Sequence, residues 1–114
     1  MLQTVINNNL SIIRRIDMIT EYLPNNKYDT IIATLRKIYD IVENDRQYAR
    51  QWVETYYEDY KDMDTKIAIE RTLDKLLDEP ETPFGVFKEH KYKYDIITDD
   101  KQNVIVISVM IMFY

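Results

Sequence analysis

The sequence predicts an α+β fold, with an N-terminal bundle of three or four helices followed by a C-terminal antiparallel β-hairpin. Apolar residues recur every three or four positions as far as residue 78, which is the spacing of amphipathic helices. Pro80 and Pro83 end that pattern, and beyond them apolar and polar residues alternate, as in half-buried strands. At 114 residues we expect a single domain, 1–114, with a helical part over 1–79 and a hairpin part over 84–114.

The first predicted helix covers residues 2–23 and ends before Pro24. Its apolar positions are Leu2, Val5, Ile6, Leu10, Ile13, Ile16, Ile19 and Leu23. Either Asn25 or Asn26 is then expected to cap a second helix. The apolar stripe of this second helix consists of Tyr28, Ile31, Ile32, Leu35, Ile38, Tyr39 and Val42.

Polar residues 43–46 are expected to separate the second helix from a third, with Asn44 or Asp45 as its cap. The third helix is expected to bury one aromatic side, made of Tyr48, Trp52, Tyr56 and Tyr60, with Met63 beyond them. A break near residues 62–65, capped by Asp64, gives a fourth helix that carries Ile69, Leu73, Leu76 and Leu77. One long helix over residues 46–78 is the alternative, and the sequence leaves both open.

The remaining residues predict a hairpin, roughly 86–98 paired with 103–114. Tyr92, Tyr94 and Ile96 alternate with Lys91, Lys93 and Asp95, which is the period-two pattern of a half-buried strand. Residues 98–103 are polar turn material, and residues 104–114 form an apolar run rich in Val and Ile. This run is about half of the ~20 residues that a helix needs to cross a bilayer, so no membrane anchor is expected.

The second strand of this hairpin is apolar on both faces, so in either register one apolar row lies beside the lysines. The helices and the lysine stems can cover that row. Alternatively, another chain covers it or pairs with the free strand edge, and a homodimer is the simplest such arrangement. The residues expected to mediate self-association are Val106, Met110 and Met112.

The composition argues against an enzyme. Gly85 is the only glycine, so the loops that bind phosphates or dinucleotides are not expected. The chain has no cysteine, and His90 is its only histidine, so no metal centre and no cofactor are expected. The N-terminal residues lack the order of a signal peptide, which predicts a cytoplasmic protein. No catalytic residue is assigned.

Negative charge is concentrated in residues 43–81, which hold twelve Asp and Glu against six Lys and Arg. This surplus accounts for the net charge of −5. The densest part predicts a partner-binding surface formed by Glu54, Tyr57, Glu58, Asp59, Asp62 and Asp64. Tyr57 is expected to be exposed there, because it lies about 100° around the helix from Tyr56. A solvated helix face is the alternative.

These observations predict a small acidic non-catalytic protein that binds and inhibits a basic or nucleic-acid-binding protein. Immunity proteins, antitoxins and phage counter-defence proteins of the anti-CRISPR type have this character. Direct binding of nucleic acid is not expected, because like charges repel. The alternative is a structural or assembly subunit, such as a viral one, that self-associates through its C-terminal strand.

Overall fold

A computed structural model describes residues 13–42, 46–78 and 90–114. Along the described chain the elements are β1 (Arg15–Tyr22), α2 (Tyr28–Val42), α3 (Arg46–Glu58), α4 (Thr65–Asp78), β2 (His90–Thr98) and β3 (Val104–Phe113). The fold is α+β, as predicted, and all three helices precede the hairpin strands β2 and β3. The described part therefore holds a bundle of three helices and not of four.

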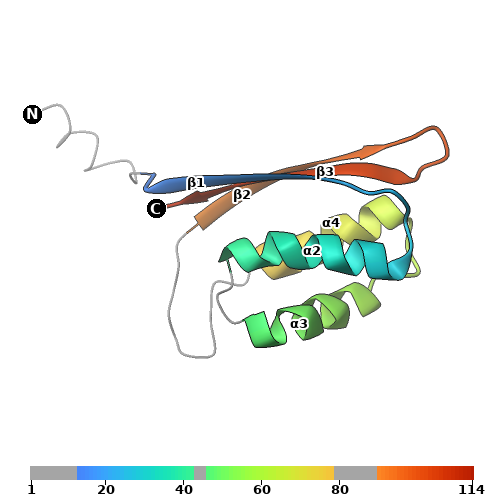
Figure 1. The fold of residues 1–114 in the computed structure, drawn as a ribbon, viewed down its shortest axis with the longest axis horizontal. Coiled ribbons are helices and arrows are strands. Elements are labelled where there is room, and N and C mark those ends of the chain that lie inside the picture. Colours follow the sequence, from blue (N-terminus) through green and yellow to red (C-terminus); the bar gives the residue numbers. More distant parts are fainter. Residues whose placement is uncertain (1–12, 43–45, 79–89) are drawn as a thin grey trace, which may run out of the picture.

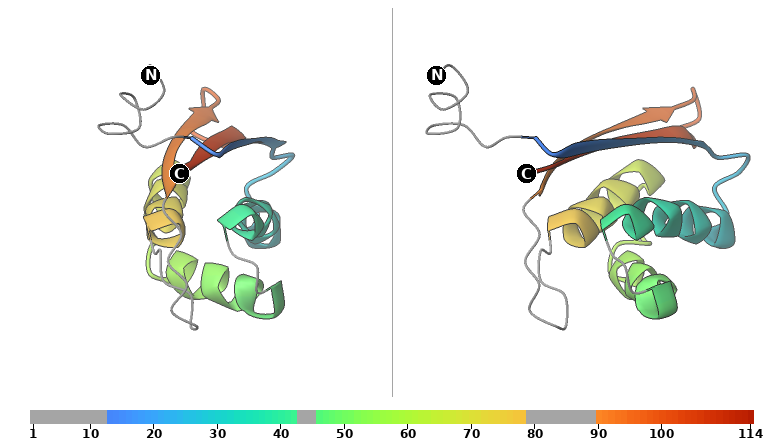
Figure 2. Two further views of the ribbon diagram at one scale, coloured as in Figure 1. Left: turned by 90° about the vertical axis from the view of Figure 1, so that its left-hand side faces the viewer. Right: turned by 60° about the vertical axis from the view of Figure 1, so that its left-hand side comes forward.

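The sheet has the strand order β1-β3-β2, and both pairings are antiparallel. The central strand β3 pairs with β1 along one edge and with β2 along the other. Near the end of β3, Phe113 lies opposite Arg15 of β1 and opposite His90 of β2. Figures 1 and 2 show three layers, in which α2 and α4 lie directly beneath the sheet and α3 lies beneath those two helices. The described helices thus cover one face of the sheet only.

The predicted helix over residues 2–23 is wrong in its second half, where β1 stands. Residues 2–12 lie outside the described residues. Ile16 and Ile19 are spaced for one face of a helix, yet in β1 they point to opposite faces of the sheet. These residues form a strand because of a distant part of the chain. β3 has backbone hydrogen-bonding groups along both edges, and β2 pairs with only one of them, so β1 pairs with the other.

The loop between β1 and α2 is held by two neighbouring asparagines with different roles. The Asn25 side-chain oxygen accepts a hydrogen bond from the backbone N–H of Lys27 (2.9 Å), and the Lys27 carbonyl accepts the first helical bond from Ile31. The Asn26 amide instead pairs with the backbone of Val104, donating to its carbonyl and accepting from its N–H, both at 2.7 Å. Asn26 therefore fastens the start of β3 to the helical layer.

The sequence left open whether residues 46–78 form one helix or two, and the structure shows two, since α3 ends at Glu58 and α4 begins at Thr65. The Asp64 carbonyl accepts the bond from the Ala68 N–H, so Asp64 occupies the cap position that was expected. The predicted breaks at residues 43–45 and at Pro80 and Pro83 lie outside the described residues.

The hairpin turn is organised by the Asp99 carboxylate, which accepts backbone N–H groups of Lys101 (2.9 Å) and Asn103 (2.8 Å). These bonds, led by that of Asn103, lower the pKa of Asp99. Gln102 has a φ of 68°, in the left-handed region where glycine is usual. The predicted hairpin is confirmed over residues 90–98 and 104–113, while residues 86–89 lie outside the described residues.

The core lies between the sheet and the helices. Of the predicted stripe of α2, Tyr28 is 39% exposed and lies outside the core. The core includes the other described stripe residues of α2, those of α4 and inward side chains of the strands: Ile31, Ile32, Leu35, Ile38, Tyr39, Ile69, Leu73, Leu76, Leu77, Ile96, Ile107, Val109 and Ile111. The predicted aromatic stripe is confirmed only in part. Tyr56 and Tyr60 are partly buried against the core, but Trp52 of α3 is 42% exposed, Met63 in the following loop is 47% exposed, and the residues that α3 buries are Val53 and Tyr57. The side chains of Val42 and Tyr48 lie outside the described set.

Candidate functional site

The sheet face opposite the helices, called the open face below, carries twelve side chains from the three strands. Burial shows which residues of each strand belong to this face. Ile107, Val109 and Ile111 of β3 are packed in the core, so the residues that alternate with them point to the open face. The open face consists of four rows across the strands: Ile16, Met112 and Lys91; Met18, Met110 and Lys93; Thr20, Ser108 and Asp95; Tyr22, Val106 and Ile97.

Large apolar side chains on this face are exposed. Met18 and Tyr22 are each 75% exposed, and Ile16 and Ile97 are each 50% exposed. Soluble monomers rarely leave a contiguous apolar patch uncovered, and such a patch commonly marks an interaction surface. The structure therefore makes the open face the strongest candidate for a binding site.

The three residues predicted to mediate self-association, Val106, Met110 and Met112, all lie in the central column of the open face. The register places Met112 beside Lys91 and Met110 beside Lys93, so the apolar row does lie next to the lysines. None of the described helices covers this row. β1 adds Ile16, Met18 and Tyr22, which the sequence reasoning missed. Their alternation with Arg15, Asp17 and Glu21 was the signal for a strand.

Few polar contacts bind the open face together. The hydroxyls of Thr20 and Ser108 lie 3.2 Å apart across the β1–β3 pair. The Lys91 ammonium lies over the Tyr114 ring, 5.8 Å from its centroid. In the described part of the chain, Lys93 and Asp95 are exposed and no carboxylate lies within salt-bridge distance of Lys93. The patch is thus mostly apolar with charges along β2.

The predicted acidic surface is only partly assembled. Glu54 accepts a charged hydrogen bond from Arg50 at 2.5 Å, and Glu58 is bound by Lys61. Arg50 also lies 3.8 Å from Asp29. Asp59, Asp62 and Asp64 remain exposed around the α3–α4 loop. Pairs between exposed charges are weak, but they offset the two glutamates that were expected to attract a basic partner.

Tyr57 was predicted to be exposed within that surface, and this prediction is wrong, because its side chain is only 5% exposed. Its ring packs at a tilt against Tyr28, with centroids 6.0 Å apart. Burial, followed by the neighbouring Tyr28, raises the pKa of Tyr57. The buried stripe of α3 is rotated by one residue from the predicted one, which turns Tyr57 inward and Trp52 outward.

Another polar group joins α4 to β2. The Asp74 carboxylate accepts hydrogen bonds from the hydroxyls of Tyr92 (3.1 Å) and Tyr94 (2.9 Å), whose rings stack with centroids 6.1 Å apart. Burial raises the pKa of both tyrosines, and the negative charges of Asp74 and Asp78 raise it further. This network fixes the position of α4 beneath β2.

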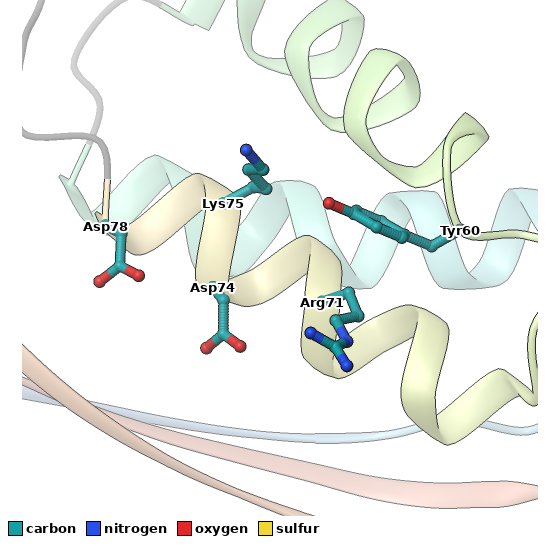
Figure 3. A pocket seen from close by; sticks show the side chains of 5 residues that line it. All are labelled: Tyr60, Arg71, Asp74, Lys75 and Asp78. Atoms are coloured by element: carbon teal, nitrogen blue, oxygen red, sulfur yellow. The ribbon is translucent and has the colours of Figure 1, made fainter.

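A cavity of about 270 Å³ next to this network is lined by Tyr60, Arg71, Asp74, Lys75 and Asp78. Figure 3 shows Asp74 and Asp78 on the side of α4 that faces the strands, whereas Lys75 points away from them. The charged groups therefore do not converge on one point. Since Asp74 is already bound by two tyrosines, the cavity offers a weaker candidate than the open face.

His90 begins β2, where its Nε2 atom contacts the Leu77 carbonyl, and its ring packs near Phe113. No catalytic role was predicted for His90, and its described contacts are structural. Across residues 13–42, 46–78 and 90–114, no three His, Cys, Asp or Glu side chains are grouped so as to hold a metal ion. None of the described helices is both long and apolar enough to cross a bilayer.

Comparison with known proteins gives no further constraint on function. No family model matches the chain, and neither the curated proteins nor the solved structures show a significant similarity to it.

Proposed function

We propose that this protein is a non-catalytic assembly protein that associates with a second copy of itself through the open face. The observation that carries the proposal is the exposure of Ile16, Met18, Tyr22 and Ile97 on a sheet face that the described helices leave uncovered. Burying such side chains contributes about 25 cal/mol for each Å² of apolar surface removed from water. A second copy supplies an apolar surface of the same extent.

The test is the mass of the protein in solution, compared with that of a charged variant. Met18→Glu places a carboxylate at a position that is 75% exposed in the single chain, so its effect on the monomer fold should be small. Met63→Glu is the matched control, because Met63 is also exposed but lies in the α3–α4 loop, away from the open face.

By analytical ultracentrifugation we expect the wild type and Met63→Glu to approach twice 13.8 kDa, and Met18→Glu to remain at 13.8 kDa. Thermal unfolding of the three proteins should confirm that all are folded. A wild type that stays monomeric up to roughly 200 micromolar, well above the range expected of a weak specific interface, contradicts the proposal. So does a Met18→Glu variant that is folded and still dimeric.

A second candidate function, the inhibition of a basic protein, is favoured by the exposed Asp59, Asp62 and Asp64. The exposed Met63 lies among them and would add apolar contact area. We expect a basic protein from the native host to be retained by the wild type and released by salt. Substituting all three aspartates by Asn should abolish its retention, whereas Met18→Glu should not. Equal retention by the Asn variant would contradict this candidate.

A further inference from the structure

The order of charges along β2 specifies how two open faces fit together. We propose that they pack about a two-fold axis running across the strands, so that Lys93 of each copy lies opposite Asp95 of the other. This inference rests on the proposed self-association and adds its geometry. It starts from the four rows of the open face, in which Lys93 belongs to the second row and Asp95 to the third.

When two facing sheets pack with their strands aligned to within about 30°, the two-fold axis between them runs either nearly along the strands or nearly across them. An axis along the strands lays β2 over the partner's β1 and keeps the rows in order. Lys93 would then face Met18 and Asp95 would face Thr20, so both charges lose water without gaining an opposite charge. An axis across the strands places each strand over the same strand of the partner, running in the opposite direction. In both arrangements the strands of the two sheets cross at about 30°.

In this reversed arrangement the second row meets the third row of the other copy. Lys93 and Asp95 then form two symmetric ion pairs at the border of the interface. The first row meets the fourth, so Ile16 and Met112 cover Tyr22 and Val106. Ile16 and Tyr22, which are exposed at opposite ends of the sheet, are thereby buried together, and the stem of Lys91 lies over Ile97.

The size of the open face sets the expected strength. With strands about 4.8 Å apart and a rise of about 3.4 Å per residue, three strands of eight residues cover roughly 400 Å² in each copy. Both copies together bury roughly 1,000 Å² once protruding side chains are included, which is the lower limit for a specific interface. We expect an interface of this small size to be weak, so single charges should change its stability measurably.

Charge reversal tests the arrangement. With Lys93→Asp, the new carboxylate of each copy faces the partner's Asp95. With Asp95→Lys, the new ammonium group of each copy faces the partner's Lys93. Each variant alone should weaken dimerisation at least tenfold, because like charges at an interface repel. The double variant restores both pairs and should dimerise within about threefold of the wild type. Lys66→Asp, at an exposed position on α4, is the control and should leave the dimer unchanged.

Mixing the two single variants gives the sharpest result. In the mixed dimer both positions 93 and 95 meet opposite charges, so an equimolar mixture of Lys93→Asp and Asp95→Lys should recover a dimer that neither forms alone. If the wild type dimerises and Met18→Glu dissociates it, but the mixture stays monomeric, the two-fold arrangement is wrong while the proposed function stands. A monomeric wild type overturns both.

Discussion

The side chain of Asn26 connects two parts of the chain that lie far apart in sequence, and its removal should be costly. Its amide makes both hydrogen bonds of the Val104 backbone, each at 2.7 Å, and the Val104 residue is fully buried. Asn26→Ala leaves the N–H and the carbonyl of Val104 without these partners. An orphaned buried group costs about 1–3 kcal/mol, so with partial access of water we expect a loss of about 2–4 kcal/mol.

Asn25→Ala is the matched control. Asn25 accepts a single bond from the exposed Lys27 N–H, so its loss should cost about 0.5–1 kcal/mol. Urea unfolding monitored by circular dichroism measures both free energies. At about 4 °C per kcal/mol for a chain of this length, the melting temperature should fall by about 8–16 °C for Asn26→Ala and by about 2–4 °C for Asn25→Ala.

The isosteric variant Asn26→Asp separates the two bonds. Its carboxylate still accepts from the Val104 N–H but repels the Val104 carbonyl, whereas the protonated acid can donate to it. The folded-state pKa of this carboxyl group is then raised above its ordinary value of about 4, so we expect the destabilisation to shrink as the pH falls from neutral toward about 4. If Asn26→Ala costs no more than Asn25→Ala, the side chain does not fasten β3 and the reasoning is refuted.

Two further predictions concern the hairpin and its contact with α4. Gln102→Gly should raise the free energy of unfolding by about 0.5 kcal/mol, because glycine adopts the φ of 68° without a Cβ clash, whereas Lys101→Gly should not stabilise. Burial and the nearby carboxylates raise the folded-state pKa of Tyr92 and Tyr94 above the ordinary value of 10.0. The stability that these two hydroxyls contribute is therefore complete below pH 10.0 and is lost as the pH rises toward their folded-state pKa values. The double variant Tyr92→Phe, Tyr94→Phe should therefore lose less stability than the wild type between about pH 10 and pH 12 in urea unfolding, and an unchanged alkaline dependence would contradict the assignment.

The helical core was predictable because its pattern is local. Leu73, Leu76 and Leu77 repeat at helical spacing within α4, and nothing elsewhere in the chain competes with that pattern. The hairpin was predictable for the same reason, since Tyr92 and Tyr94 alternate with lysines just before a polar turn. Local periodicity therefore gave both the fold class and the strand pair that forms most of the open face.

The errors arose where a local pattern has two readings. Ile16 and Ile19 fit a helix, and only the far strand β3 decides in favour of β1. In α3, the aromatic spacing of Trp52 and Tyr56 looked like a core stripe, but the residues that this helix buries are Val53 and Tyr57. The exposed apolar residues of β1 were missed with the strand itself, so the open face was predicted only in its central column.

The strand order β1-β3-β2 has a consequence for how the chain folds. The hairpin closes between residues a few positions apart, whereas β1 must find β3 across the whole helical segment, pairing Tyr22 with Val106 and Arg15 with Phe113. Contacts of such long sequence separation form slowly. An intermediate with the helices and the hairpin docked, and with β1 still detached, is therefore expected to come before the native state. Its exposed β3 edge would accept β1 from another chain as readily as its own, so concentrated refolding should favour strand-swapped dimers.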